Sequence, residues 1–145
     1  MTDDVPGWAR ELLSQAQVAR LGTADAAGQP LVVPVCYAID LSGDRRVYTA
    51  IDAKPKRTRA LRRLRNIAEN PRVSLAVDHY DEDWRNLRYV IVEGRAEILT
   101  EGPERQRALA LLVAKYPQYR AMELERQADP VIAIIPRHFS YWRAA

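Results

Sequence analysis

The chain has 145 residues, of which 48% are hydrophobic and 28% are charged, with 22 Lys and Arg against 19 Asp and Glu. This length suits one domain with one core, and the composition is ordinary for a globular protein. No apolar run approaches the roughly 20 residues of a membrane-spanning helix, and a single cysteine excludes an internal disulfide.

The opening residues, MTDDVPGWARELL, are acidic and include Pro6 and Gly7, so we expect no secretory signal. The lone cysteine, Cys36, fits a reducing cytoplasm. We therefore expect a single cytoplasmic domain over residues 1–145 without a membrane partner. With one cysteine and two histidines, we expect no protein-built zinc or iron site, so redox chemistry would need a bound organic cofactor.

The first half of the chain predicts one short helix and then three strands. Apolar residues recur at helical spacing in residues 8–19, and β-rich runs cover 19–25, 31–39 and 46–51. The last two runs predict a hairpin around the turn Leu41-Ser-Gly-Asp44. Pro34 cannot donate a backbone hydrogen bond, which indicates an edge, a bulge or a ligand-facing position.

The second half predicts helices and strands in alternation. The predicted helices are 55–69, ended by Asn70-Pro71, then 103–116 and a short one at 118–126; the predicted strands are 72–79, 88–99 and 131–143. Gly94 indicates a bulge or a close backbone approach. Six strands with mostly short connections and a few inserted helices predict a mainly β antiparallel barrel.

The most distinctive feature is a basic segment, Lys54–Arg65 (KPKRTRALRRLR), with seven Lys or Arg and no acidic residue. It follows a predicted strand and runs into a predicted helix, where cationic side chains and free helical N–H groups can converge on a phosphate. Two other readings remain open: a solvated helix face, or a nucleic-acid-binding helix. The second is disfavoured because no helix-turn-helix partner or interleaved aromatic residue accompanies the segment.

Several of these stretches together resemble a known family. They are the hairpin PLVVPVCYAID–GDRRVYTAID, the block KPKRTRALRRLRNIAENPRVSLAVDHYDEDW and the strand VEGRAEIL. Over about residues 10 to 143 the chain resembles the split β-barrel flavin and deazaflavin oxidoreductases, relatives of pyridoxamine 5′-phosphate oxidase. Within them it is most similar to the subgroup that uses the deazaflavin coenzyme F-420.

The resemblance implies a six-stranded split β-barrel that forms a homodimer, with each cofactor in a groove between subunits. Lys54, Lys56 and Arg57 would meet the cofactor phosphate. Coenzyme F-420 carries an oligoglutamate tail, for which Arg59, Arg62 and Arg63 would supply charge-assisted pairs. The residues expected along the cofactor ring are Val33, Pro34, Val35, Thr49 and Ala50, with Trp84 as a cover or as a rim-packing residue.

The resemblance also implies hydride transfer from the reduced deazaflavin to a small conjugated acceptor, with no catalytic side chain assigned. His79 and His138 have no evident partner in the sequence, and either Tyr141 or Trp142, by strand alternation, would supply an aromatic wall. A pyridoxal-type substrate is not expected, because only Arg143 near the C-terminus could hold it. The alternatives are a split barrel that binds FMN or haem, and a cofactor carrier without turnover.

Overall fold

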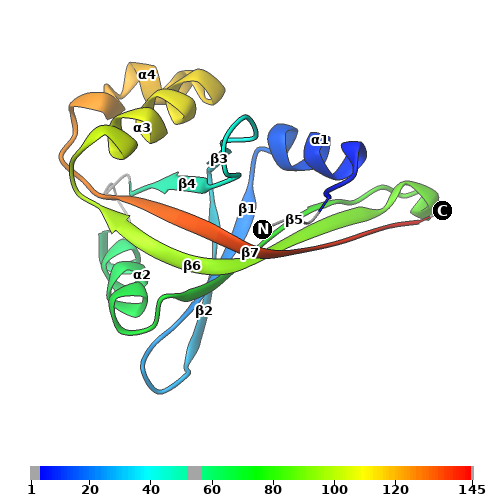
Figure 1. Ribbon diagram of the computed structural model, residues 1–145, viewed down its shortest axis with the longest axis horizontal. Coiled ribbons are helices and arrows are strands. Elements are labelled where there is room, and N and C mark those ends of the chain that lie inside the picture. The colour runs from blue at the N-terminus through cyan, green and yellow to red at the C-terminus, as the bar shows by residue number, and fades with distance from the viewer. Residues whose placement is uncertain (1–3, 52–56, 145) are drawn as a thin grey trace.

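The structure, a computed structural model, describes residues 4–51 and 57–144. One antiparallel sheet of seven strands, in the order β2-β1-β5-β6-β7-β4-β3, curls into a half-barrel (Figure 1). The elements are α1 (Gly7–Gln15), β1 (Ala19–Ala24), β2 (Pro30–Val35), β3 (Ala38–Ile39), β4 (Val47–Ala50), α2 (Arg57–Glu69), β5 (Arg72–His79), the 3-10 turn η1 (Trp84–Asn86), β6 (Arg88–Leu99), α3 (Pro103–Lys115), α4 (Pro117–Ala121), the 3-10 turn η2 (Leu124–Arg126) and β7 (Val131–Arg143).

The sequence predicts the mainly β, antiparallel class with inserted helices, and the structure confirms it. The predicted number of strands was wrong, because the run 31–39 divides into β2, which pairs with β1, and β3, which pairs with β4. These two strands form opposite edges of the sheet. Cys36 and Tyr37 connect them: the Thr49 hydroxyl donates a 2.7 Å hydrogen bond to the Cys36 carbonyl, and the buried Tyr37 hydroxyl donates to the Leu13 carbonyl.

The two longest strands, β6 and β7, form the spine of the sheet (Figure 1). Their pairing runs from Leu99 opposite Val131 to Arg88 opposite Arg143, and its register shifts between Glu93 and Gly94. A Cβ on Gly94 would lie 2.2 Å from the Ile135 carbonyl oxygen, so only glycine fits this approach. The bulge or close approach predicted at Gly94 is therefore confirmed.

Helices α1 and α2 both cover the inner face of the curl. Leu13 of α1 and Ile67 of α2 belong to one core with the inward side chains of the strands. Asn66 of α2, also buried, donates a 3.0 Å hydrogen bond from its amide to the Thr23 hydroxyl on β1. Inward residues of β1, β5 and β6 alternate with more exposed ones, as expected for a sheet with one buried face.

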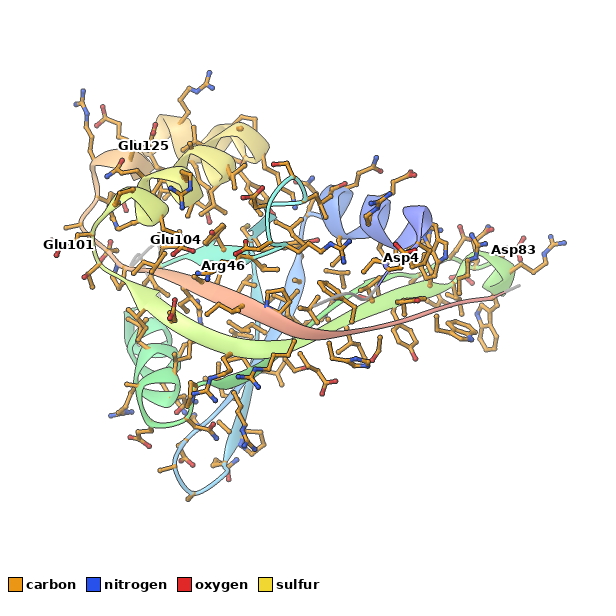
Figure 2. All side chains as sticks on the ribbon, viewed as in Figure 1. Asp4, Arg46, Asp83, Glu101, Glu104 and Glu125 are labelled. Atoms are coloured by element: carbon orange, nitrogen blue, oxygen red, sulfur yellow. The ribbon has the colours of Figure 1, made fainter. Side chains whose placement is uncertain are left out.

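Helix α3 packs on the other side of β4, in a second core with η2 and the start of β7. At its N-terminal turn, Glu104 accepts 2.9 Å hydrogen bonds from the Arg46 guanidinium and the Tyr48 hydroxyl (Figure 2). The helix dipole also favours a carboxylate in this first turn. Within the described residues, no helix is long and apolar enough to cross a membrane.

Candidate functional site

The outer face of the sheet is the surface on which α1 and α2 do not pack. Cα partners across β1, β5 and β6 form the rows Arg20–Ala76–Ile91 and Gly22–Ser74–Glu93 there, and the members on the central strand β5, Ala76 and Ser74, are small. At the neighbouring edge, β2 presents Val32, which is 65% exposed, and the exposed Pro34. Because side chains in the middle of this face are short, a planar group can approach the backbone closely.

Helix α2 carries the described part of the basic segment. The predicted helix is confirmed over Arg57–Glu69, and Asn66 and Ile67 anchor it to the inner face. Arg62 and Arg65 are exposed, and Arg63 is half-buried. Lys54 and Lys56 lie outside the described residues, as do the side chains of Arg57 and Arg59. The phosphate and tail contacts expected of these residues therefore remain predictions.

The residues predicted along the cofactor ring do not share one surface. Val33 and Val35 point into the inner core, at 6% and 7% exposure, whereas Pro34 between them is exposed. Thr49 and Ala50 are buried in the same subunit. Of these five residues, Pro34 alone presents its side chain outward, and the others can offer only their backbone to a ring from that side.

Trp84 lies in η1, at the end of β5 that is remote from α2. Asp83, labelled in Figure 2, marks this end, and its carboxylate accepts hydrogen bonds from the backbone and guanidinium of Arg85. Trp84 is 68% exposed. Because β5 has eight residues, about 26 Å of strand separates the two ends. Within one subunit, Trp84 therefore lies far from the end of β5 that follows α2.

The two aromatic residues near the C-terminus point to opposite faces, as alternation requires. Tyr141 turns inward and meets the Trp8 ring edge to face, with 6.0 Å between ring centroids. Trp142 turns outward and stacks on Tyr89 with 5.9 Å between centroids. On the outer face, the aromatic wall expected from one of these two residues would therefore be Trp142.

A buried polar network that the sequence did not reveal joins α3 to the connection between α1 and β1. Tyr116 donates from its hydroxyl to the carbonyls of Gln17 and Tyr37, at 2.9 and 3.1 Å, and accepts from the Tyr37 amide. Burial raises the pKa of Tyr116 to about 12 and lowers the pKa of Lys115 to about 8. Little in the sequence indicated this network, because Lys115 and Tyr116 lie at the end of a predicted helix, just before Pro117.

Neither histidine sits in a catalytic constellation. The His79 imidazole lies 3.9 Å from the Asp81 carboxylate, and His138 on β7 pairs with Glu93 across the strands as a Cα partner. Among residues 4–51 and 57–144, no group of three or more His, Cys, Asp or Glu side chains is placed to hold a metal. The described part of the chain thus offers surfaces for binding and no cluster of metal ligands.

Comparison with protein families and curated proteins identifies related sequences. The family described as pyridoxamine 5′-phosphate oxidase matches residues 6–143. A 5a,11a-dehydrotetracycline/5a,11a-dehydrooxytetracycline reductase from Streptomyces rimosus is 30% identical over 124 residues, which cover 85% of this chain and 72% of that protein.

Solved structures share the fold at lower identity. A conserved hypothetical protein from Mycobacterium tuberculosis aligns with a TM-score of 0.72 and 22% identity, covering 99% of this chain and 89% of that one. An FAD-binding protein from Mesorhizobium loti (TM-score 0.67, 24% identity, 91% and 87% covered) and the heme storage protein HutZ from Vibrio cholerae (0.67, 17%, 92% and 90%) are also similar. At these identities the likeness shows the fold alone.

Proposed function

Because this chain belongs to the pyridoxamine 5′-phosphate oxidase family, with a match over residues 6–143, we propose that it is an oxidoreductase that binds coenzyme F-420. The observation that carries the proposal is one concentrated cationic segment in a chain that also presents an open sheet face. Seven Lys and Arg residues lie within Lys54–Arg65, whereas the rest of the chain has 15 basic and 19 acidic residues. A ligand with a phosphate and several carboxylates matches that charge better than one with a single phosphate.

The fit of a deazaflavin can be judged on the described residues. Its planar ring needs an apolar surface, and the outer face offers the exposed Val32 and Pro34 beside the small residues Gly22 and Ala76. Its phosphate and tail need cations, and α2 continues the basic segment along exposed Arg62 and Arg65. The residues present therefore fit the group.

The chain's own residues would bind and orient the coenzyme. In this proposal Lys54, Lys56 and Arg57 hold the phosphate, Arg59, Arg62 and Arg63 hold the tail, and Pro34 with the outer face supports the ring. The coenzyme, when bound, supplies the hydride. Rate would come from holding an acceptor against one ring face in a position excluded from water.

A second copy of the chain would complete the site. The outer face carries exposed Val32, Tyr89 and Trp142, an apolar surface on a sheet whose other face is already covered. We propose that two copies meet there, with a cofactor in each groove between them. In such a homodimer Trp84 would be able to approach a cofactor held by the basic segment of the other subunit, which it cannot do within its own.

The acceptor proposed is a small conjugated molecule, and the relative from Streptomyces rimosus, a reductase, supports reduction as the direction of catalysis. The test is to mix the protein anaerobically with reduced F-420 and a panel of quinones and enones, and to follow the return of deazaflavin absorbance. Acceptor-dependent oxidation supports the proposal. Tight binding without oxidation by any acceptor would indicate a cofactor carrier.

A second candidate is a split barrel that binds a flavin nucleotide or haem. The FAD-binding protein from Mesorhizobium loti and the heme storage protein from Vibrio cholerae share this fold. A yellow colour in the purified protein, with flavin released on denaturation, would favour the flavin. A Soret band would favour haem.

A further inference from the structure

Three basic residues form a row across the end of the sheet that is remote from α2. His79 on β5 is the Cα partner of Arg88 on β6, and Arg88 is the Cα partner of Arg143 on β7. Cα partners on neighbouring strands point to the same side of a sheet, so the three side chains share one face. It is the inner face, since Val77, Val90 and Phe139 on the same alternation are buried.

The bulge in β6–β7 creates this row. From Leu99 opposite Val131 to Gly94 opposite Pro136, the two strands keep one register. If that register continued without a shift, Trp142 would lie opposite Arg88. The shift at Glu93/Gly94 brings Arg143 there instead. Like charges directly opposite each other destabilise an antiparallel strand pair. The two guanidinium groups therefore do not stabilise the sheet when no anion is bound.

Neither guanidinium has a carboxylate within ion-pair distance among the described residues. Arg88 donates a 3.3 Å hydrogen bond to the Asn86 carbonyl, and the Arg143 guanidinium lies 5.3 Å from the centroid of the Trp8 ring. By contrast, two neighbouring arginines are paired: Arg20 with Asp78 and Arg85 with Asp83, each at 2.8 Å. The two arginines of the row remain available to an anion.

The row lines a groove of about 1020 Å³ between α1 and the ends of β5, β6 and β7. Its lining contains four arginines, Arg20, Arg85, Arg88 and Arg143, against the carboxylates of Glu11 and Asp78, one of which is already paired. Trp8 and Tyr80 contribute aromatic rings to the same lining. The groove therefore combines free positive charge with apolar rings at a volume typical of small-molecule sites.

We propose that this groove binds a planar aromatic molecule carrying a phosphate or carboxylate group. Arg88 and Arg143 would bind the anion from two sides, and the ring would pack against Trp8. Within one subunit the site is separate from the described part of the basic segment on α2, because β5 spans about 26 Å between the two ends. The inference thus stands without the cofactor assignment made above.

The probe is 1-naphthyl phosphate, with 1-naphthol and inorganic phosphate for comparison, titrated by calorimetry at low ionic strength. We expect 1-naphthyl phosphate to bind more tightly than either, and Arg88→Gln or Arg143→Gln to weaken it at least about tenfold. Arg143→Lys should restore part of the affinity. Arg126→Gln also removes a positive charge, from an arginine that is paired with Glu123 and lies outside the groove lining, and should leave binding within about twofold.

Two further variants separate this site from the proposed cofactor site. Lys56→Ala should leave 1-naphthyl phosphate binding unchanged, and Arg143→Gln should leave F-420 binding unchanged. The proposal is overturned if the wild-type protein binds no 1-naphthyl phosphate at millimolar concentration, if 1-naphthol binds equally well, or if Arg126→Gln and Arg143→Gln weaken binding alike. Loss of binding in Lys56→Ala alone would place the anion at the basic segment. Circular dichroism spectra confirm that each variant is folded.

Discussion

Lys115 donates a 2.7 Å hydrogen bond from Nζ to the main-chain carbonyl of Ala16, which joins the end of α3 to the connection between α1 and β1. The same ammonium group lies 3.9 Å from the centroid of the Tyr37 ring and 5.3 Å from that of Tyr116. Two aromatic rings and a carbonyl thus lie around the Lys115 ammonium group, and burial has removed much of its hydration. This arrangement makes the stability of the fold depend on pH in a defined direction.

The first prediction concerns that dependence. Burial lowers the pKa of Lys115 from 10.5 to about 8, so between these values the unfolded chain binds more protons than the folded one. The contribution of Lys115 to the free energy of unfolding therefore increases as pH rises from 8 to 10.5. The free energy of unfolding is measured for the wild type and for Lys115→Met at each pH, and the variant's value is subtracted so that the titration of the tyrosines cancels. This difference in free energy should rise between pH 8 and 10.5. A difference that is flat or falling would contradict the assigned environment.

The second prediction concerns the close approach in the β6–β7 spine. Gly94→Ala should lower the free energy of unfolding by about 3 kcal/mol, because its Cβ would meet backbone atoms of Ile135 that cannot move aside cheaply. Gly7→Ala is the control, since nothing lies within 4 Å of a Cβ there. Urea denaturation measures both. Equal midpoints for the two variants would mean that the strands separate readily at the bulge.

The third prediction concerns the contact between α3 and β4. Glu104→Gln should cost about 1.5–3 kcal/mol, since it replaces the charged acceptor for the Arg46 guanidinium and the Tyr48 hydroxyl. The same hydroxyl has its pKa raised, mainly by burial and then by its bond to Glu104, so tyrosinate formation monitored by ultraviolet absorbance should begin at lower pH in the variant. Glu101→Gln, on an exposed residue just before the helix, should change neither quantity. An unaltered titration in Glu104→Gln would refute the contact.

The fourth prediction tests the proposed homodimer. Ala76→Glu places a charge in the middle of the outer face and should convert a dimer to a monomer in sedimentation experiments, because an unpaired charge cannot be buried cheaply. Ala110→Glu makes the same change at an exposed position of α3 and should leave the dimer intact. F-420 affinity should fall only in the first variant. A wild-type monomer, or a dimer that tolerates Ala76→Glu, would remove the second subunit from the site.

The sequence predicted the strands whose alternating pattern was strong. The runs 72–79, 88–99 and 131–143 match β5, β6 and β7 residue for residue, because alternation and the flanking turns define them. The run 31–39 is equally β-rich, yet it contains two strands that pair at opposite edges. Propensity does not report the pairing partner, so the break at Cys36 and Tyr37 depends on tertiary contacts.

Residues of the candidate sites that meet only through tertiary contacts could not be predicted from the sequence either. The basic segment is evident from composition, because its charges are adjacent in the chain. Arg88 and Arg143 are 55 positions apart, and they meet only because a bulge shifts the register of β6–β7. Gly94 predicted that a bulge was possible but not which residues it would bring together. Likewise, alternation predicted that Tyr141 and Trp142 diverge, whereas the burial of Val33, Val35 and Ala50 depended on which face α1, α2 and α3 cover.

The most direct test of the central proposal is a titration of the purified protein with coenzyme F-420 and, separately, with FMN, followed by tryptophan quenching. We predict micromolar or tighter binding of F-420, clearly stronger than that of FMN. Lys56→Ala should weaken F-420 about tenfold or more, the loss of a charge-assisted contact. A preference for FMN, or F-420 affinity unchanged in Lys56→Ala, would contradict the account.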